Sequence, residues 1–220
     1  MPGAAAFFDL DRTLLRRSSA LALAPTFRER GLISRRQMAR AAVWQLMFML
    51  RGASADTVKR AAEGGLLVLR GYSPKEMQSL VVDSMERVLK PLVYAESLDL
   101  VELHRRRGEP VYIVSATLQE IVQVIADDLG FDGALGTICE VKEGKYTGRS
   151  TRPLHADAKA RCIRELGHDL DASTAYSDSH TDLPFLEAVG HPVVVNPDRK
   201  LRRIAARRGW PVLEFGRRAA

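Results

Sequence analysis

Cysteine is scarce in this chain, and long apolar runs are missing. Its two cysteines, Cys139 and Cys162, have neither zinc-site nor redox-pair spacing, so a reduced compartment is expected. The longest apolar block, residues 41–50, is interrupted by Gln45 and is far shorter than the ~20 residues of a membrane span. The start of the chain lacks the basic and apolar regions of a secretion signal. We therefore expect a cytoplasmic protein.

Aromatic residues make up only 6% of the chain, while the net charge is +6. Much of the basic excess falls late, between residues 199 and 218. Such a segment attracts phosphate, nucleic acid or anionic lipid, or it forms a solvated helix face and a frayed tail. Because aromatics are not interleaved with the basic residues and no nucleic-acid motif is present, we favour the solvated face and expect no nucleic-acid partner.

The order of strand and helix signals predicts the fold class. With 220 residues the chain can form one domain with an insertion. Residues 16–90 show helix signals only, and from Pro91 onwards strands alternate with helices. We predict an α/β fold, a Rossmann-like parallel sheet flanked by helices, with an inserted α-helical bundle cap. The catalytic core would comprise residues 1–15 and 91–220, and the cap residues 16–90.

Local sequence signals predict the bounds of the individual helices and strands. Helices are expected from Ser18 to Phe27 with a stop at Gly31, from Ser34 to Leu50, from Ser54 or Asp56, and from Met77 to Leu89 after a Ser73-Pro74 start. Later helices are expected over 95–107, 118–129 and 156–166. Strands are expected at 4–8, 110–115, 137–141, 146–148, 174–177, 193–195 and 212–215, with a hairpin turn at Glu143-Gly144.

Two predicted strands end in paired aspartates. Asp9 and Asp11 follow the first strand, and Asp178 and Asp182 follow the strand at 174–177. Asp9 and Asp11 converge if the strand continues, or flank a tight turn if it stops. Two carboxylates held close together repel each other, and a cation bound between them offsets this repulsion. Because ligands bind at the carboxyl ends of parallel strands, the four acids predict a Mg²⁺ site there.

The same acids suit phosphate-ester hydrolysis. Asp9 can attack phosphorus and form an aspartyl-phosphate, and Asp11 can give a proton to the leaving alcohol and later take one from water. Asp178 would ligate Mg²⁺, and Asp182 would either ligate it or hold a metal-bound water. His180, a lone histidine beside these acids, is not expected to be essential.

Polar and basic residues elsewhere suit phosphate binding. Ser115 can offer its hydroxyl and the adjacent backbone N–H of Ala116 to a phosphoryl oxygen. Lys159 can supply positive charge. Thr13 can hold the turn after the first strand and stand beside the phosphate. Structural alternatives remain open: Ser115 and Asp182 could only cap helices, and Lys159 could be a solvated helix lysine. The nearby Arg161 and Arg164 are also cationic, so the choice of Lys159 as the phosphate-binding cation is open too.

The ordered motifs resemble those of the haloacid dehalogenase superfamily, over nearly the whole chain, and within it the phosphoserine-phosphatase-like subfamily with a helical cap. The motifs are Asp9-Leu10-Asp11-Arg12-Thr13, Ile113-Val114-Ser115-Ala116-Thr117, Lys159, and Tyr176 to Pro184 with Asp178 and Asp182. The resemblance implies Asp9 as nucleophile and Asp11 as acid/base that also lends its backbone carbonyl to Mg²⁺. It also implies phosphate binding by Ser115 and Lys159.

Two departures bear on the substrate. Phosphoserine phosphatases carry a glutamate seven residues after the second aspartate, which recognises the substrate amine, and this chain has Ser18 there. They also carry glycines where this chain has Ala116 and Thr117. Both departures count against phosphoserine as the substrate but leave the expected phosphoryl chemistry on a small phosphorylated metabolite intact.

Several alternatives stay open. The chain could be a phosphotransferase, or a non-catalytic phosphate- or metal-sensing module that binds a partner through its basic end. We interpret the apolar stripe from Trp44 to Leu50 as the core of the helical bundle. The alternatives are that it lines a pocket for an apolar substrate or docks on a membrane that carries a lysophospholipid. Arg12 could contact the substrate or form a salt bridge. The oligomeric state is open.

Overall fold

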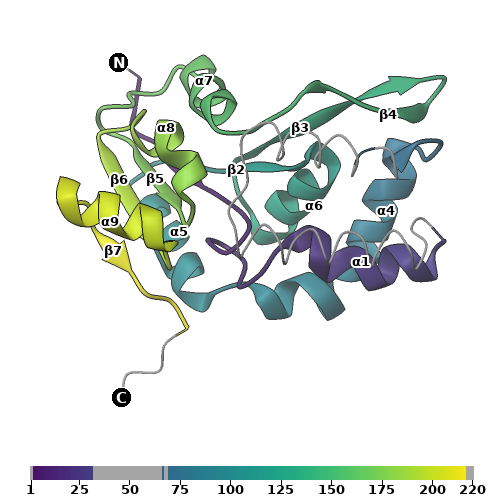
Figure 1. The fold of residues 1–220 in the computed structure, drawn as a ribbon, viewed down its shortest axis with the longest axis horizontal. Helices are drawn as coiled ribbons and strands as arrows, with labels where there is room; N and C mark the ends of the chain where they lie inside the picture. Colours follow the sequence, from purple (N-terminus) through teal and green to yellow (C-terminus); the bar gives the residue numbers. More distant parts are fainter. Residues whose placement is uncertain (1, 32–65, 67–68, 217–220) are drawn as a thin grey trace.

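One mostly parallel sheet forms the centre of the molecule (Figure 1). The computed structural model describes residues 2–31, 66 and 69–216, and within them the strand order is β4-β3-β2-β1-β5-β6-β7. All neighbouring pairs are parallel except β3 and β4. The strands are β1 (Ala6–Phe8), β2 (Val111–Leu118), β3 (Gly133–Lys142), β4 (Lys145–Arg152), β5 (Thr174–Ser177), β6 (His191–Val195) and β7 (Val212–Leu213). The predicted α/β class is confirmed.

Helices cover both faces of this sheet. Successive side chains of β1 point to opposite faces, so Phe8 packs with α5 and α6 while Phe7 packs with α7, α8 and α9. The helices are α1 (Ser19–Glu29), α4 (Pro74–Ser84), α5 (Ala95–Arg106), α6 (Gln119–Leu129), α7 (Asp157–Glu165), α8 (Leu183–Leu186) and α9 (Arg199–Arg208). Shorter turns are η2 (Met85–Leu89), η3 (Lys90–Leu92) and η4 (His180–Asp182).

The described part of residues 16–90 is helical, as expected. α4 packs against α6, and α1 packs against α4 (Figure 1). Ser73 and Glu76 form a capping box at the predicted helix start, and Gly31 ends the first helix in a left-handed conformation. The division into core and cap stays a prediction. The expected helices from Ser34 to Leu50 and from Ser54 or Asp56, with the apolar stripe, lie outside the described residues.

Some predicted boundaries were wrong. The helix expected to run through Leu89 is α-helical only to Ser84, and a π-helical turn and a 3₁₀ turn follow. Pro91, which has no N–H to donate, lies just beyond and prevents a regular continuation. β2 extends to Leu118 rather than to residue 115, and its pairing with β3 is irregular between Val114 and Leu118. Ser115 therefore lies inside a bulged strand.

The basic segment near the C-terminus forms α9. Leu201, Ile204 and Ala205 are buried, and the arginines of the helix are exposed. Two of them are paired, Arg202 with Glu214 and Arg208 with Glu187. The helix thus has the solvated face that the sequence favoured, while residues 217–220 lie outside the described part. None of the helices that the structure describes is long and apolar enough to cross a membrane.

Candidate active site

The aspartates at positions 9 and 178 lie together at the carboxyl ends of neighbouring strands. Phe8 pairs with Ile113 of β2 and with Tyr176 of β5. Asp9 comes next, and its N–H donates to the carbonyl of Tyr176 at 2.9 Å. Asp178 lies two residues beyond Tyr176, and both carboxylates are buried. The parallel register therefore brings residues 169 positions apart to one edge of the sheet, as the strand pattern predicted.

The chain turns sharply after β1. The N–H groups of Leu14 and Leu15 both donate to the carbonyl of Leu10, and Arg12 has a positive φ of 64°. Of the two geometries considered for the first acid pair, the tight turn is the one found. The Asp11 carboxylate then accepts a hydrogen bond from the Ser19 N–H at 2.8 Å, at the first residue of α1. The turn fixes Asp11 between the strand end and a helix N-terminus.

Lys159 reaches the carboxylates from α7. Its Nζ lies 2.5 Å from Asp9 Oδ1 and 2.7 Å from Asp182 Oδ2, and the side chain is 3% exposed. Its neighbours at 161 and 164 are exposed. Asp182 Oδ2 also accepts from the Ser177 hydroxyl at 2.8 Å. The idea that Lys159 is a solvated lysine is therefore wrong, and Asp182 bonds to Lys159 and Ser177 rather than capping α8 with its side chain.

Asp178 has a different cationic partner. Arg12 Nη2 lies 2.9 Å from Asp178 Oδ2, so of the two roles considered for Arg12 the structure shows a salt bridge. The Asp178 carbonyl accepts from the Asp198 N–H at 2.9 Å. The Asp198 carboxylate in turn accepts from the backbone N–H of His180, contacts His180 Nδ1 and caps α9. The loop that carries Asp178 and Asp182 is thus tied to the start of α9.

Two hydroxyl groups lie in the first and second motifs. Ser115 is 2% exposed, and its Oγ accepts from the Thr117 N–H at 3.1 Å, while no side chain caps α6. The capping alternative for Ser115 is therefore wrong. Ala116 is exposed, and its carbonyl accepts from Thr137. Thr13 is buried, and its Oγ1 has no hydrogen-bond partner among the residues that the structure describes, although its carbonyl accepts from Ser97.

Burial raises the pKa of Asp9, Asp11 and Asp178. The pKa of Asp9 rises from 3.8 to about 7, because burial and the charge of Asp182 outweigh Lys159. Burial and the nearby Asp9 charge raise the pKa of Asp178, against the effect of Arg12. Burial also raises the pKa of Asp11, against the hydrogen bonds from Ser19. For Lys159, burial alone would lower the pKa, but Asp182 and Asp9 raise it overall.

The excess of negative charge suits a divalent cation. Four carboxylates share this cluster with two cations, Lys159 and Arg12. In residues 2–31, 66 and 69–216 no three histidine, cysteine, aspartate or glutamate side chains form a ready metal-binding group. Mg²⁺ keeps several waters and needs only one or two protein carboxylates, so Asp9 and Asp178, which repel each other, fit it. The unpartnered Thr13 hydroxyl offers a further polar group in the same loop.

Several residues of the site were not predicted from the sequence. They are Ser19, which binds Asp11; Ser177, which binds Asp182; and Asp198, which binds His180. Ser177 directly precedes Asp178, and Ser19 begins a predicted helix, so both positions carried a local signal. Asp198 carried only the signal of a helix cap, because its contact with the loop at 178–182 depends on the packing of β6 beside β5.

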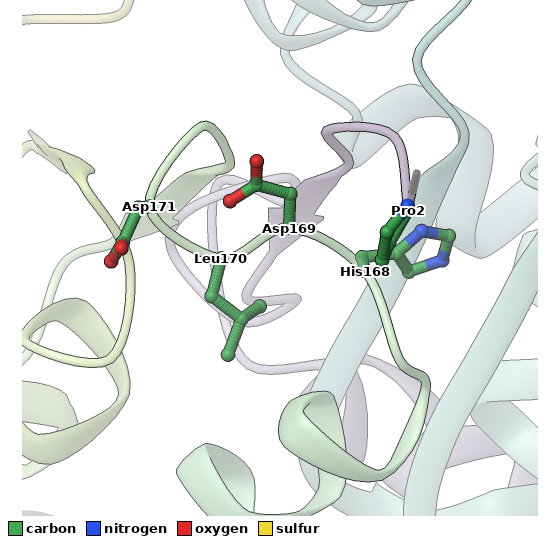
Figure 2. Close-up of a pocket in the computed structure, with 5 residues that line it drawn as sticks. All are labelled: Pro2, His168, Asp169, Leu170 and Asp171. Carbon is green, nitrogen blue, oxygen red and sulfur yellow. The ribbon is translucent and has the colours of Figure 1, made fainter.

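A second group of acids lies at the opposite edge of the sheet. A cavity of about 340 Å³ is lined by Pro2, His168, Asp169, Leu170 and Asp171 (Figure 2). These residues precede β1 and β5, whereas Asp9 and Asp178 follow those strands. In Figure 2 the carboxylates of Asp169 and Asp171 point in different directions. This cavity is therefore separate from the cluster around Lys159.

Comparisons with known proteins find similar sequences and a similar structure. The sequence profile described as haloacid dehalogenase-like hydrolase matches residues 6–187. The chain is 44% identical over 217 residues to "Probable phosphatase Rv3661" of Mycobacterium tuberculosis, covering 97% of this chain and 76% of that protein. It is 35% identical over 218 residues to "Phosphoserine phosphatase SerB1" of the same organism, covering 96% and 71%. A crystal structure of a protein with unknown function from Bordetella pertussis Tohama I matches with a TM-score of 0.83 and 30% identity, covering 97% of this chain and 99% of that one.

Proposed function

The chain belongs to the haloacid dehalogenase-like hydrolases and is a phosphoric monoester hydrolase, and we propose that it is a Mg²⁺-dependent phosphatase acting on a small phosphorylated metabolite through an aspartyl-phosphate. The observation that carries this proposal is the contact of Lys159 with both Asp9 and Asp182. A buried lysine between two carboxylates keeps a nucleophile in place and supplies positive charge for the oxygens of a bound phosphoryl group. A lysine that formed only a surface ion pair would be solvated, whereas the side chain of Lys159 is 3% exposed.

The proposed reaction has two displacements at phosphorus. In the first, an Asp9 oxygen bonds to phosphorus, the ester P–O bond breaks, and the leaving oxygen takes the proton of Asp11. In the second, water attacks the aspartyl-phosphate, Asp11 takes the proton of that water, and the P–O bond to Asp9 breaks to release orthophosphate. Burial raises the pKa of Asp11, which favours the protonated form that a general acid needs.

The remaining residues bind and orient. Ser115, the backbone N–H of Ala116, Thr13 and Lys159 would hold the phosphoryl oxygens. Asp9 and Asp178 would hold Mg²⁺, with the backbone carbonyl of Asp11 completing the protein ligands and Asp182 acting through Lys159 or a metal-bound water. When bound, the cation neutralises charge on the phosphoryl group and on Asp9.

The environment of Asp11 bears on the leaving group. Ser18 lies at the N-cap of α1, and hydrogen bonding from its side chain partly opposes the rise that burial causes in the pKa of Asp11. A neutral hydroxyl therefore stands where phosphoserine phosphatases carry the glutamate that recognises an amine. This supports a metabolite without an ammonium group beside the phosphoester. A cytoplasmic location and the lack of a nucleic-acid partner stay predictions.

A substrate screen with a matched control tests the proposal. Purified protein is offered a library of phosphate monoesters with and without Mg²⁺, and released orthophosphate is measured. Asp9→Asn is expected to abolish release, whereas Asp171→Asn, which removes an exposed acid at the opposite edge of the sheet, leaves it unchanged. Mass spectrometry of an acid-quenched reaction is expected to find the phosphoryl group on the peptide that contains Asp9. Turnover by Asp9→Asn at the wild-type rate would exclude this residue as the nucleophile.

A further inference from the structure

Arg12 has an unusual place in the candidate site. Its guanidinium bonds to Asp178, a carboxylate only 6% exposed, yet the arginine side chain itself is 48% exposed. Residue 12 is also held in a left-handed backbone conformation, φ 64°, which costs free energy for an arginine. The turn that orients Asp9 and Asp11 therefore also directs the Arg12 side chain across the carboxyl end of β5.

The two cations of the site have separate partners. Lys159 bonds to Asp9 and Asp182, whereas Arg12 bonds to Asp178. Asp178 is the acid that the proposed function assigns to Mg²⁺. A small divalent ion attracts the same carboxylate lone pairs as the guanidinium and repels the guanidinium charge at short range. Each of the two cations therefore weakens the binding of the other to the Asp178 carboxylate.

We propose that Arg12 and the divalent cation compete for Asp178, so that the Arg12–Asp178 salt bridge breaks when the cation binds. This inference rests on the proposed function, because it takes Asp178 as a ligand of the cation. Since the arginine is half-exposed, its guanidinium can leave the carboxylate and return to water without disturbing the core. Arg12 thus stabilises the cation-free site and weakens cation binding. The freed guanidinium then lies at the exposed side of the site, where it can meet an anionic substrate.

Calorimetric titration of metal-stripped protein with Mg²⁺ alone tests the competition without an activity measurement. Arg12→Asn removes the charge, and asparagine tolerates the left-handed backbone better than arginine. We expect it to bind Mg²⁺ roughly three- to thirtyfold more tightly than the wild type, which is less than the loss of a fully buried hydrogen bond between charged groups would give, because Arg12 is half-exposed. Arg12→Lys keeps the charge and is expected to stay closer to the wild type.

Loss of any nearby positive charge strengthens cation binding to some degree, so a matched control is needed. Arg16 lies in the same segment, but its guanidinium is stacked on the Tyr94 ring. Arg16→Gln is expected to change Mg²⁺ affinity less than twofold. Asp178→Asn is expected to abolish tight binding in both the wild-type and the Arg12→Asn background, which would place the cation at Asp178.

The outcomes separate this inference from the proposed function. If the wild type binds Mg²⁺ and Arg12→Asn binds it equally or more weakly, the salt bridge does not compete and only the inference fails. An Arg16→Gln effect as large as that of Arg12→Asn would likewise overturn it, because general charge would explain both. If neither the wild type nor Arg12→Asn binds Mg²⁺, the inference and the metal dependence of the proposed function both fail.

Discussion

The Asp11 carboxylate accepts a hydrogen bond from the Ser19 backbone N–H at 2.8 Å, which joins the turn after β1 to the first residue of α1. The same carboxylate is the proposed acid/base, so its structural and chemical roles can be separated by mutation. An asparagine at position 11 keeps an oxygen that accepts from the Ser19 N–H, but it has no acidic proton to transfer.

Asp11→Asn should therefore lower kcat by about 10²- to 10⁴-fold and change the free energy of unfolding by less than about 1 kcal/mol. The loss should be smaller for an aryl phosphate, whose leaving group needs no proton, than for an alkyl phosphate. Steady-state kinetics with both esters, together with urea unfolding, measure these effects. Equal losses for both esters would argue against proton donation by Asp11.

Replacement of Lys159 should affect both activity and folding. Lys159→Met leaves Asp9 and Asp182 without their shared cation, so the free energy of unfolding should fall by roughly 3 kcal/mol near pH 8. Hydrolysis should fall by at least about 10²-fold, because the positive charge at the phosphoryl oxygens is lost. Arg161→Met, on the exposed side of α7, is the control and should alter neither. A Lys159→Met protein with wild-type turnover would remove Lys159 from the site.

Asp9 should make the stability of the metal-free protein depend on pH. Its pKa is raised in the folded state from 3.8 to about 7, so folding takes up a proton between these values. The contribution of Asp9 to stability is then full below about pH 4 and is lost as the pH rises through about 7.

Asp9→Asn, which does not titrate, should gain stability relative to the wild type over that window, by less than about 1.4 kcal/mol per pH unit. Urea unfolding of both proteins in EDTA, at pH 5 and pH 8, measures the difference. If the free energy of unfolding of Asp9→Asn, relative to that of the wild type, does not increase from pH 5 to pH 8, the pKa of Asp9 is not raised. Saturating Mg²⁺ should reverse the trend for the wild type, since the cation binds the ionised carboxylate.

The sequence predicted the parts of the fold and site that depend on local pattern. Asp9 and Asp178 were found because an apolar strand ends directly before each, and parallel strands align their carboxyl ends. Lys159 could also be read from periodicity, since it shares a buried helix face with Cys162 and Ile163 while Arg161 and Arg164 are exposed.

What the sequence could not predict depends on contacts across the fold. The salt bridge of Arg12 with Asp178 requires the turn geometry at residue 12 and the position of β5 beside β1. The extension of β2 past Ser115 depends on the pairing of Leu118 with Thr137 in β3, which no local signal at 115–118 indicated. The link from Asp198 to His180 depends likewise on neighbouring strands.

Ala156, the residue directly before α7, has φ 43° and ψ −112°, a conformation that glycine adopts readily and alanine does not. Its carbonyl accepts from the Lys159 N–H at 3.1 Å, so the strained residue is fixed by the helix that carries Lys159. Ala156→Gly should relieve the strain and raise the free energy of unfolding by about 1 kcal/mol, after the entropy cost of glycine. Ala158→Gly, in the first turn of α7, should lower it by up to about 1 kcal/mol. If residue 156 is strained, urea unfolding gives changes in the free energy of unfolding with opposite signs for the two variants. A loss of stability in both variants would show that alanine is not strained at this position.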